Sequence, residues 1–369
     1  MKIKILTITP ALSLCGGIES YTMNYYRNMS NNVKMDFITH EMKDENYKNQ
    51  IEKNGGNVYL FPVINLKNLK SFLKQLAEFF KEHHDYDVIH CNMANAAVFY
   101  FYFAKKYGIK VRIIHSHQNN FADKFTHKLR NIPLIFFGKK LATHNFACSK
   151  IAGDFLYKSK KYEVINNAID VEKFKFNENT RKRIREKEKI KEDEILFANI
   201  GRFCNQKNQL FLIDIFNLIY KKNKKVKLFL IGDGELKERL IEKIDKLKLN
   251  DNIFVKGPIN NVNEYLQAID VLIMPSLYEG LPVIGVEAQA SGVQCFFSDT
   301  ITKEAKILDD TVYIKLNSTP EEWCDIILKH VKCLHRSNQT ENVSYKGFNI
   351  KQESKKLENL YYKYVKKEM

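Results

Sequence analysis

Short apolar segments that alternate with helical patterns along the whole chain are the feature that most constrains its fold. In the first half these segments span 2–9, 35–40, 57–62, 86–92, 111–117, 144–149 and 162–169. In the second half they span 194–201, 225–232, 252–257, 271–276, 293–299 and 311–316. Strands that are apolar along nearly their whole length are typical of parallel sheets buried on both faces, joined by right-handed helical crossovers. The pattern predicts an α/β chain with two doubly wound parallel sheets.

The length of 369 residues also favours two domains. A polar stretch at 170–193 separates the two sets of strands, and we place the domains at 1–168 and 169–348. Within that stretch, residues 181–194 alternate acids with bases, and we interpret them as an exposed helix. Residues 335–347 read as a second polar connector. A last helical pattern runs from 349 to the C-terminus, and we expect this helix to pack back on the first domain.

Charge and cysteine content narrow the class of protein. The net charge of +16 fits nucleic acid, an anionic membrane surface, anionic small molecules or simply a solvated basic surface. No recognisable nucleic-acid-reading module is present, so we expect no nucleic-acid partner. The seven cysteines form no CxxC pair, which argues against a disulfide framework and a structural zinc site and favours a reducing cytosol.

The first residues deserve a separate test, because two lysines, an apolar run and Cys15 superficially resemble a lipoprotein signal. Leu14 is too large for the residue before such a cleavage site, and Pro10 interrupts the apolar run. We therefore interpret this segment as a buried first strand followed by a glycine loop. No window approaches 18 apolar residues, so we expect no helix that spans a membrane.

Polar clusters follow several predicted strands, at the edge where doubly wound sheets bind their ligands. Gly16 and Gly17 come after the first strand, where two glycines allow backbone amides to approach an anion, although a plain tight turn is the alternative. Arg202 and Lys207 follow the strand at 194–201 and together suit a diphosphate, although two surface bases are the alternative. The Gly-Asp-Gly at 232–234 favours a tight turn, and a close backbone approach to a ligand is the alternative.

Two carboxylates stand eight residues apart in the segment PSLYEGLPVIGVEAQASG at 275–292. Pro282 suits the first position of a helix, so we expect a helix that begins near Leu281 and points the amides around Leu281 and Val283 at a ligand. Glu279 lies before this helix and Glu287 lies more than one turn inside it. The two side chains would then contact different parts of one ligand, a sugar and a ribose diol. The alternative is an exposed cap and a solvated helix residue.

A histidine pair ends the strand at 111–117. His115 and His117 flank Ser116, and metal ligation is one interpretation. No carboxylate at a matching spacing supports a metal site, and a histidine at a strand end is often a hydrogen-bonded structural group.

Taken together, five motifs resemble those of the family-4 glycosyltransferases. They are GGIE at 16–19, GRFCNQKN at 201–208, IGDGELK at 231–237, KGPINNVNEYL at 256–266 and, above all, E-x7-E at 279–287. The resemblance runs over nearly the whole chain and implies the GT-B architecture, two facing Rossmann-like domains with an interdomain cleft. The sequence EAQASG followed by SDTITKE resembles the sequences of a bacterial subgroup associated with capsular or exopolysaccharide assembly.

The family resemblance implies a reaction. It is the retaining transfer of a hexose from a nucleotide-diphosphate sugar, with no metal and no cofactor besides that co-substrate. The first domain would bind the acceptor and the second the donor, which the subgroup suggests is a UDP-sugar. The acceptor would be lipid-linked or a glycan, and the enzyme would work in the cytoplasm, at the inner face of the membrane. A non-catalytic nucleotide-sugar-binding subunit is the alternative function.

The resemblance also assigns roles to the motif residues. Arg202 and Lys207 would hold the diphosphate, assisted by the amides near Leu281 and Val283. The transferred sugar and the ribose would contact the two carboxylates, and the glycines would close over the donor. The complete set is Gly16, Gly17, Arg202, Lys207, Leu281, Val283 and Glu287 for donor binding, with His117 and Glu279 as catalytic residues. His115 is the alternative to His117, because the register at this strand end is open.

Aromatic and basic residues mix in the segment FADKFTHKLRNIPLIFFGKKL at 121–141. Such a segment can lie on an anionic leaflet with its apolar side chains among the lipids. A core helix with a rim of lysines is the alternative. We therefore predict a peripheral contact with an anionic membrane at this segment.

Overall fold

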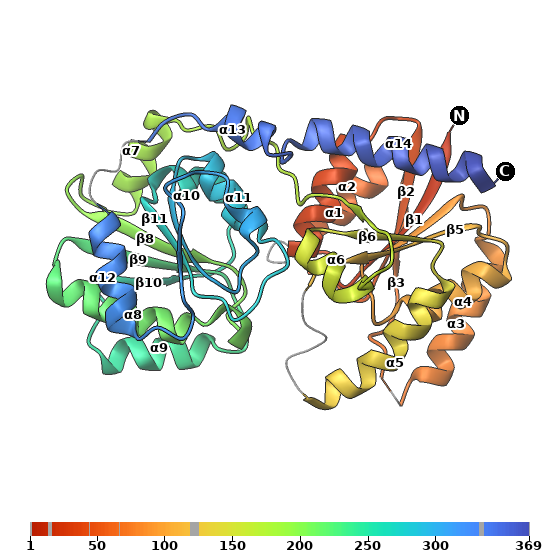
Figure 1. Cartoon of the computed structure of the whole chain (residues 1–369), viewed down its shortest axis with the longest axis horizontal. Coiled ribbons are helices and arrows are strands. Elements are labelled where there is room, and N and C mark those ends of the chain that lie inside the picture. Colours follow the sequence, from red (N-terminus) through yellow and green to blue (C-terminus); the bar gives the residue numbers. More distant parts are fainter. Residues whose placement is uncertain are drawn as a thin grey trace. The chain divides into compact units, whose positions relative to one another are not determined.

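A computed structural model describes residues 2–13, 17–43, 45–65, 67–118, 125–331 and 336–368, without the side chains of 125–127. The chain forms two compact units (Figure 1). Unit 1 comprises Met1–Asn167 together with Ile350–Met369, and unit 2 comprises Ala168–Asn349. The C-terminal helix α14 (Ile350–Glu368) therefore belongs to unit 1, although unit 2 precedes it in the sequence.

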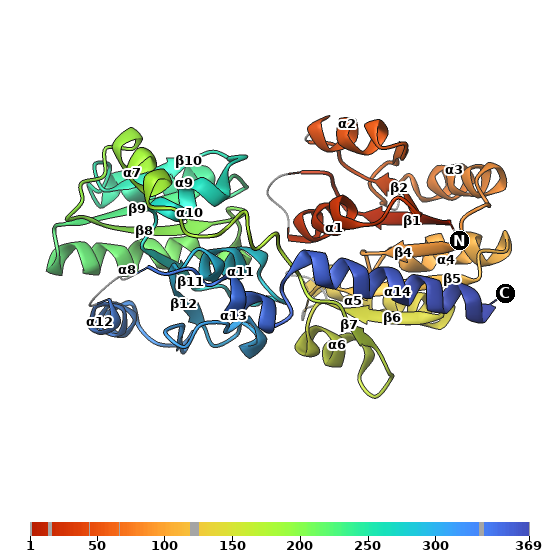
Figure 2. The same ribbon diagram turned by 90° about the horizontal axis from the view of Figure 1, so that it is seen from above.

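Unit 1 is a parallel sheet in the order β3-β2-β1-β4-β5-β6-β7. Its strands are β1 (Ile3–Thr9), β2 (Val33–Thr39), β3 (Val58–Leu60), β4 (Val88–Cys91), β5 (Val111–Ser116), β6 (His144–Ala147) and β7 (Glu163–Val164). Besides α14, its helices are α1 (Gly17–Asn28), α2 (Glu45–Lys53), α3 (Leu69–Glu82), α4 (Ala97–Lys106), α5 (Phe125–Leu141) and α6 (Lys150–Tyr157). Seen from above, helices lie on both faces of this sheet, with α1 and α14 side by side (Figure 2).

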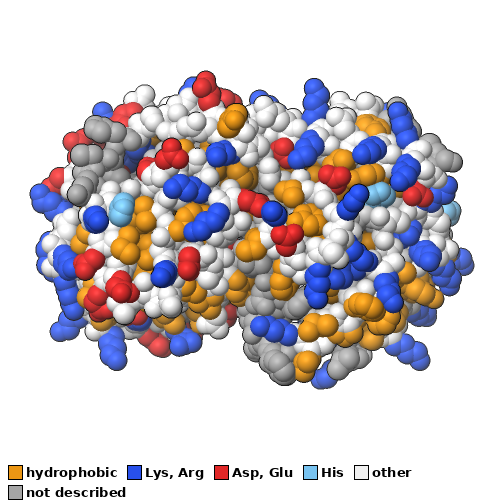
Figure 3. All heavy atoms as spheres, viewed as in Figure 1, with side chains coloured by type: hydrophobic (Ala, Val, Ile, Leu, Met, Phe, Trp, Pro, Cys, Tyr) orange, Lys and Arg blue, Asp and Glu red, His pale blue; other side chains and the backbone are white. Residues whose placement is uncertain are grey.

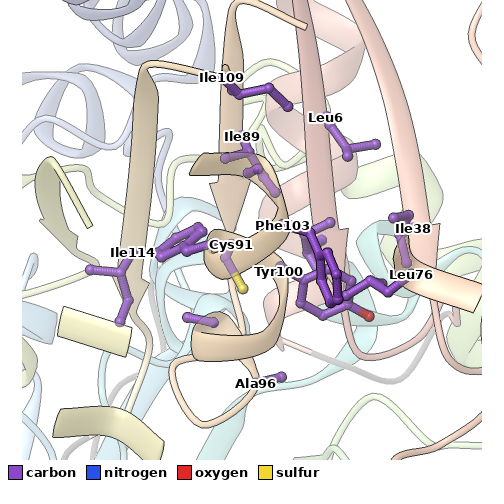
Figure 4. Packing of buried hydrophobic residues seen from close by; sticks show 14 of the residues in the cluster. Leu6, Ile38, Leu76, Ile89, Cys91, Ala96, Tyr100, Phe103, Ile109 and Ile114 are labelled. Atoms are coloured by element: carbon purple, nitrogen blue, oxygen red, sulfur yellow. The ribbon is translucent and has the colours of Figure 1, made fainter. Parts of the chain in front are cut away.

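The core of unit 1 lies between the sheet and helices α3 and α4. Leu6 and Ile89 from the central strands pack with Leu76 of α3 and with Tyr100 and Phe103 of α4 (Figure 4). Leu6, Leu76, Ile89 and Tyr100 are fully buried. Because the central strands are covered on both faces, their apolar residues are nearly continuous in the sequence, as parallel sheets require.

Unit 2 repeats the arrangement in a parallel sheet of order β10-β9-β8-β11-β12-β13. Its strands are β8 (Ile195–Ile200), β9 (Val226–Ile231), β10 (Ile253–Lys256), β11 (Val271–Met274), β12 (Gln294–Ser298) and β13 (Val312–Ile314). Its α-helices are α7 (Glu178–Lys187), α8 (Gln209–Lys222), α9 (Lys237–Lys246), α10 (Val262–Ala268), α11 (Val283–Ala290), α12 (Pro320–His330) and α13 (Thr340–Tyr345). Two 3-10 turns, η1 (Asn205–Lys207) and η2 (Lys303–Ala305), follow β8 and β12.

The predicted fold class is confirmed. Each apolar segment predicted from the sequence overlaps one of these strands, and the strand pairs of both sheets are parallel. Residues 349 to the C-terminus begin with the helix α14, as their pattern predicts. The strand orders are those of Rossmann-like sheets, in which the direction of chain progression reverses beside the first strand.

The interpretation of residues 181–194 as an exposed helix is wrong for Arg181 and Arg185, although most of the other basic side chains in the stretch are exposed. The stretch includes the end of α7, whose Arg185 is only 5% exposed. Arg181 and Arg185 both bond the carboxylate of the buried Asp270, at 2.6 and 3.1 Å. The basic run therefore contributes a buried ion cluster, which its alternating charges do not reveal.

The polar connector at 335–347 also contains a buried cation. The guanidinium of Arg336 donates hydrogen bonds to the carbonyls of Leu266, Gln267, Ile269 and Ser291. Arg336 thereby satisfies carbonyls at the ends of α10 and α11, which would otherwise lack partners. The polar sequence around Arg336 gives no signal of this buried role.

Basic side chains are spread over both units on the face shown in Figure 3. They do not gather there into one stripe, which favours the solvated basic surface among the interpretations of the net charge. Among the described residues, no helix is both long enough and apolar enough to cross a membrane.

Candidate functional site

The loops that follow β8 and β11 carry the predicted donor-binding residues of unit 2. These two strands are neighbours in the sheet, and the chain progresses away from β8 in opposite directions on its two sides. Parallel strands end at the same edge, so the two loops lie together. The backbone N–H of Leu277 donates to the carbonyl of Gln206 at 2.8 Å, and the Gln206 side chain donates to the carbonyl of Tyr278 at 3.0 Å.

Lys207 and Glu279 form the central contact of this site. The Lys207 ammonium lies 2.5 Å from one carboxylate oxygen of Glu279, and the two side chains are only 16% and 9% exposed. The interpretation of Glu279 as an exposed cap is therefore wrong, because the carboxylate is buried against a cation. Arg202, on the same loop as Lys207, has an exposed side chain.

The Gly-Asp-Gly at 232–234 fixes the shape of the β8 loop. A Cβ on Gly232 would lie 2.0 Å from the carbonyl oxygen of Gly201, and one on Gly234 would lie 2.4 Å from that of Phe203. Both glycines also have positive φ, at 148° and 156°. The prediction of a tight turn is wrong: these glycines permit a close backbone approach, here to the neighbouring loop, and the turn begins at Glu235.

Helix α11 starts two residues later than the predicted position at Leu281. It begins at Val283, and Pro282 is its N-cap with an extended ψ of 114°. Leu281 and Val283 are both buried, at 4% and 6% exposure. Residues 280–282 separate Glu279 from the N-terminus of this helix, which carries a partial positive charge.

Glu287 lies just over one turn into α11 and is partly buried. Burial raises the pKa of its carboxyl to about 7, an effect that the positive charge of Lys173 opposes. The interpretation of Glu287 as a solvated helix residue is therefore wrong. A carboxyl that titrates near neutral pH inside a ligand-binding fold is a candidate for contact with a ligand.

Gln289 is a residue that the sequence analysis missed. Its buried side chain donates to the carbonyls of Gly285 and Ala305 and accepts from the N–H groups of Ile307 and Leu308 and from the Thr311 hydroxyl. These bonds fix the loop between β12 and β13 against α11. A polar residue among the small apolar residues of VEAQASG was the signal that could have revealed it.

In unit 1, three histidines gather near the carboxyl ends of β4 and β5. His90 Nδ1 lies 2.6 Å from the Tyr361 hydroxyl of α14, and His90 Nε2 lies 3.0 Å from His115 Nδ1. The His117 ring stacks on that of His115 with centroids 4.0 Å apart, and its Nε2 lies 2.9 Å from Asn92 Oδ1. His115 is 1% exposed, whereas His117 is only partly buried and is the more accessible candidate.

The glycine loop is described only in part. Gly16 lies outside the described residues, and Gly17 is the exposed first residue of α1. A Cβ on Gly17 would meet no heavy atom within 4 Å, so packing does not require glycine there. Within the described ranges, no three histidine, cysteine, aspartate or glutamate side chains group as a metal site would need.

Two family models match consecutive parts of the chain. The model described as "Glycosyltransferase Family 4" matches residues 15–173, and "Glycosyl transferases group 1" matches residues 180–348. The chain belongs to the family-4 glycosyltransferases. The first model corresponds to most of unit 1 and the second to most of unit 2, so both halves of the GT-B fold are accounted for.

Relatives place this glycosyltransferase in bacterial polysaccharide biosynthesis. The chain is 29% identical to the glycosyltransferase EpsF of Bacillus subtilis over 358 residues, which covers 94% of this chain and 93% of EpsF. It is 23% identical to the capsular polysaccharide biosynthesis glycosyltransferase CapH of Staphylococcus aureus, over 94% and 95% of the two chains. Among solved structures, that of HepE from Anabaena in complex with UDP-glucose matches with a TM-score of 0.79 and 16% identity, over 97% and 99% of the chains.

Proposed function

We propose that this glycosyltransferase is a retaining, metal-independent enzyme that moves a hexose from a UDP-sugar to a lipid-linked or glycan acceptor. The observation that carries the proposal is the buried Lys207–Glu279 ion pair beside the start of α11. A buried ion pair is costly to maintain unless its charges have further partners or a function. A diphosphate is the dianionic group that a lysine, a nearby arginine and a helix N-terminus would together bind.

The pair suggests how the donor would be received. Without a donor, Glu279 neutralises Lys207. With a donor, the ammonium of Lys207 and the guanidinium of Arg202 would contact the diphosphate, and Glu279 would accept hydrogen bonds from hydroxyls of the sugar. Charge on the diphosphate grows as the glycosidic bond breaks, so cations placed there stabilise the transition state more than the ground state.

The proposed transfer requires no nucleophile from the protein. The bond from the anomeric carbon to the diphosphate oxygen breaks, and the acceptor oxygen bonds to that carbon on the same face. The acceptor's proton passes to the departing phosphate oxygen. Two similar proteins support the proposed substrates. The structure of HepE contains UDP-glucose. A relative from Escherichia coli, 26% identical over 80% of each chain, is a UDP-Gal:alpha-D-GlcNAc-diphosphoundecaprenol alpha-1,3-galactosyltransferase.

A donor screen tests the proposed function. UDP- and GDP-sugars are offered with diphosphoundecaprenyl-linked sugars in EDTA, and release of the nucleoside diphosphate is followed together with the mass and anomeric configuration of the product. We expect one UDP-sugar to react with retained configuration. An inverted product or a requirement for added metal would overturn the mechanism. Tight UDP binding without transfer to any acceptor would instead favour the non-catalytic subunit.

The pKa of Glu287 predicts a pH dependence of nucleotide binding. Ribose hydroxyls donate hydrogen bonds, and an ionised carboxylate accepts them better than a protonated one. Because Glu287 ionises near pH 7, we expect the Kd for UDP to fall as the pH rises from 6 to 8. Titration calorimetry measures this trend. In Glu287→Gln, affinity should be lower at pH 8 and the slope smaller, limited to the part that ionisation of the UDP phosphate at about pH 6 supplies, whereas the same slope in the variant would exclude Glu287 as its source.

We also propose that the enzyme docks on an anionic bilayer through α5. Leu129, Ile132, Phe136 and Phe137 of this helix are 47–58% exposed. Basic side chains accompany them, and Lys140 lies 4.5 Å from the centre of the Phe136 ring. Hydrophobic and basic side chains are mixed in this region of Figure 3. The core-helix alternative holds for Ile135, which is 5% exposed, but not for these four residues.

Vesicle sedimentation tests the docking surface. We expect the enzyme to bind phosphatidylglycerol vesicles at low salt, and Phe136→Glu/Phe137→Glu to weaken binding at least about tenfold, since two charges replace side chains that insert in the interface. Tyr345→Glu is the matched control, because Tyr345 is an aromatic residue 89% exposed on α13 of unit 2. Equal loss in both variants, or no binding by the unmodified enzyme, would contradict docking through α5.

A further inference from the structure

We propose that Asn92 is a positioning residue: it holds His117 in the neutral Nε2–H tautomer, so that Nδ1 accepts a hydrogen bond from a hydroxyl of the transferred sugar. The proposal deepens the proposed function and rests on the placement of His117 at the donor sugar. It assigns a direction to that contact, because a hydroxyl must donate to His117 rather than accept from it.

Asn92 is rigidly placed. It directly follows β4, its side chain is 3% exposed, and its backbone N–H donates to the carbonyl of Ile8 in β1 at 3.0 Å. Its side-chain oxygen lies 2.9 Å from Nε2 of His117. A carbonyl oxygen can only accept, so Nε2 must carry the proton of this hydrogen bond.

The surroundings of His117 keep its ring neutral. Burial, together with the charge that the neighbouring His90 can carry, lowers the pKa of His117 to about 3. A neutral imidazole carries one N–H, so a proton on Nε2 leaves Nδ1 as an acceptor. The titratable groups around the histidine cluster are His90 and His115 from β4 and β5, Tyr21 and Tyr25 from α1, Tyr361 and Glu353 from α14, and Cys148 after β6.

The ring plane of His117 is also fixed from behind. It stacks on His115 and tilts against Tyr21, with centroid distances of 4.0 and 4.9 Å. His115 is in turn bonded to His90, whose other nitrogen contacts the Tyr361 hydroxyl. A ring supported on one face and bonded at Nε2 has little freedom to reorient, so the direction of Nδ1 is set before a ligand arrives.

Replacing Asn92 with aspartate tests the direction of the contact. A carboxylate at this position favours the imidazolium and raises the pKa of His117, and Nδ1 then becomes a donor. We expect transfer by Asn92→Asp to approach that of the unmodified enzyme at pH 8 and to be about tenfold lower at pH 6, the loss that one such hydrogen bond predicts. The unmodified enzyme should show no such step. The matched control is Asn145→Asp, which adds a carboxylate on β6, where the amide bonds the Lys161 carbonyl.

Nitrogen NMR of the enzyme labelled at histidine reads the tautomer independently of activity. We expect His117, assigned with His117→Gln, to show a protonated Nε2 and an unprotonated Nδ1 at pH 7. A protonated Nδ1 in the unmodified enzyme would overturn the proposal, because the amide of Asn92 would then be donating. A flat pH profile in Asn92→Asp, with an imidazolium seen by NMR, would also overturn it. Failure of the unmodified enzyme to transfer any sugar would refute the proposed function instead.

Discussion

Lys207→Ala should lower the rate of glycosyl transfer by about 10²–10³, which is typical of removing one preorganised group that stabilises developing negative charge. The ammonium of Lys207 is held by Glu279, and the loop that carries Lys207 is fixed by its close contact with Gly232 and Gly234. Single-turnover kinetics with saturating donor measure the effect on the chemical step. Lys222→Ala is the control, because Lys222 pairs with Asp325 at the surface of unit 2.

A second substitution, at Glu279, distinguishes the effect of Lys207 on catalysis from its effect on stability. Lys207→Ala leaves the buried Glu279 unpaired, so a lower melting temperature is expected with the loss of rate. Lys207→Ala/Glu279→Gln removes both charges and should recover stability, but it should not recover transfer. Recovery of transfer in the double variant would contradict a direct role for Lys207 at the diphosphate. A rate for Lys207→Ala within about threefold of the control would contradict it as well, since that change is far below the expected loss.

Asp270→Ala should destabilise unit 2 by about 3–5 kcal/mol, the usual cost of removing one partner from a buried ion pair. The carboxylate of Asp270 is 3% exposed, bonds Arg181 and Arg185, and accepts the backbone N–H of Leu196 at 2.8 Å. Its loss removes the carboxylate from both guanidinium groups, which keep only carbonyl acceptors, and leaves the N–H of Leu196 at the start of β8 without this acceptor.

Urea unfolding followed by fluorescence of the single tryptophan, Trp323 in α12 of unit 2, measures this change. The control is Asp325→Ala, because Asp325 is an exposed partner of Lys222 and exposed pairs contribute little to stability. An unfolding midpoint for Asp270→Ala equal to that of the control would show that the two arginines find other partners.

The sheets could be predicted from the sequence because burial on both faces imposes nearly continuous apolar strands, and each of those segments forms a strand. Buried polar groups could not be predicted in the same way. Arg185 stands in a run that alternates charges, and Gln289 stands in a helix of small residues, yet both are buried in hydrogen-bonded positions. Whether a polar side chain points to solvent or to a carbonyl depends on elements distant in the sequence.

The role of the glycines at 232 and 234 could not be predicted from the sequence either. The Gly-Asp-Gly at 232–234 has the composition of a turn, and the sequence supports that interpretation. The steric demand comes instead from the carbonyls of Gly201 and Phe203, about thirty positions earlier, which approach within 2.4 Å of where a Cβ would lie. A close approach between two loops is invisible until the strands before them are placed side by side.

For the candidate site, the sequence by itself determined the family, the two Rossmann-like sheets and the location of the motif residues at strand ends. Only the tertiary structure decided that Lys207 and Glu279, 72 positions apart, share one buried contact, and that His117 is bonded by Asn92. The physical reason is the order of parallel strands: β8 lies beside β11 and β4 beside β5, so loops distant in the chain meet at one edge of each sheet. Residue types establish which chemistry is available, and strand order establishes which groups can act together.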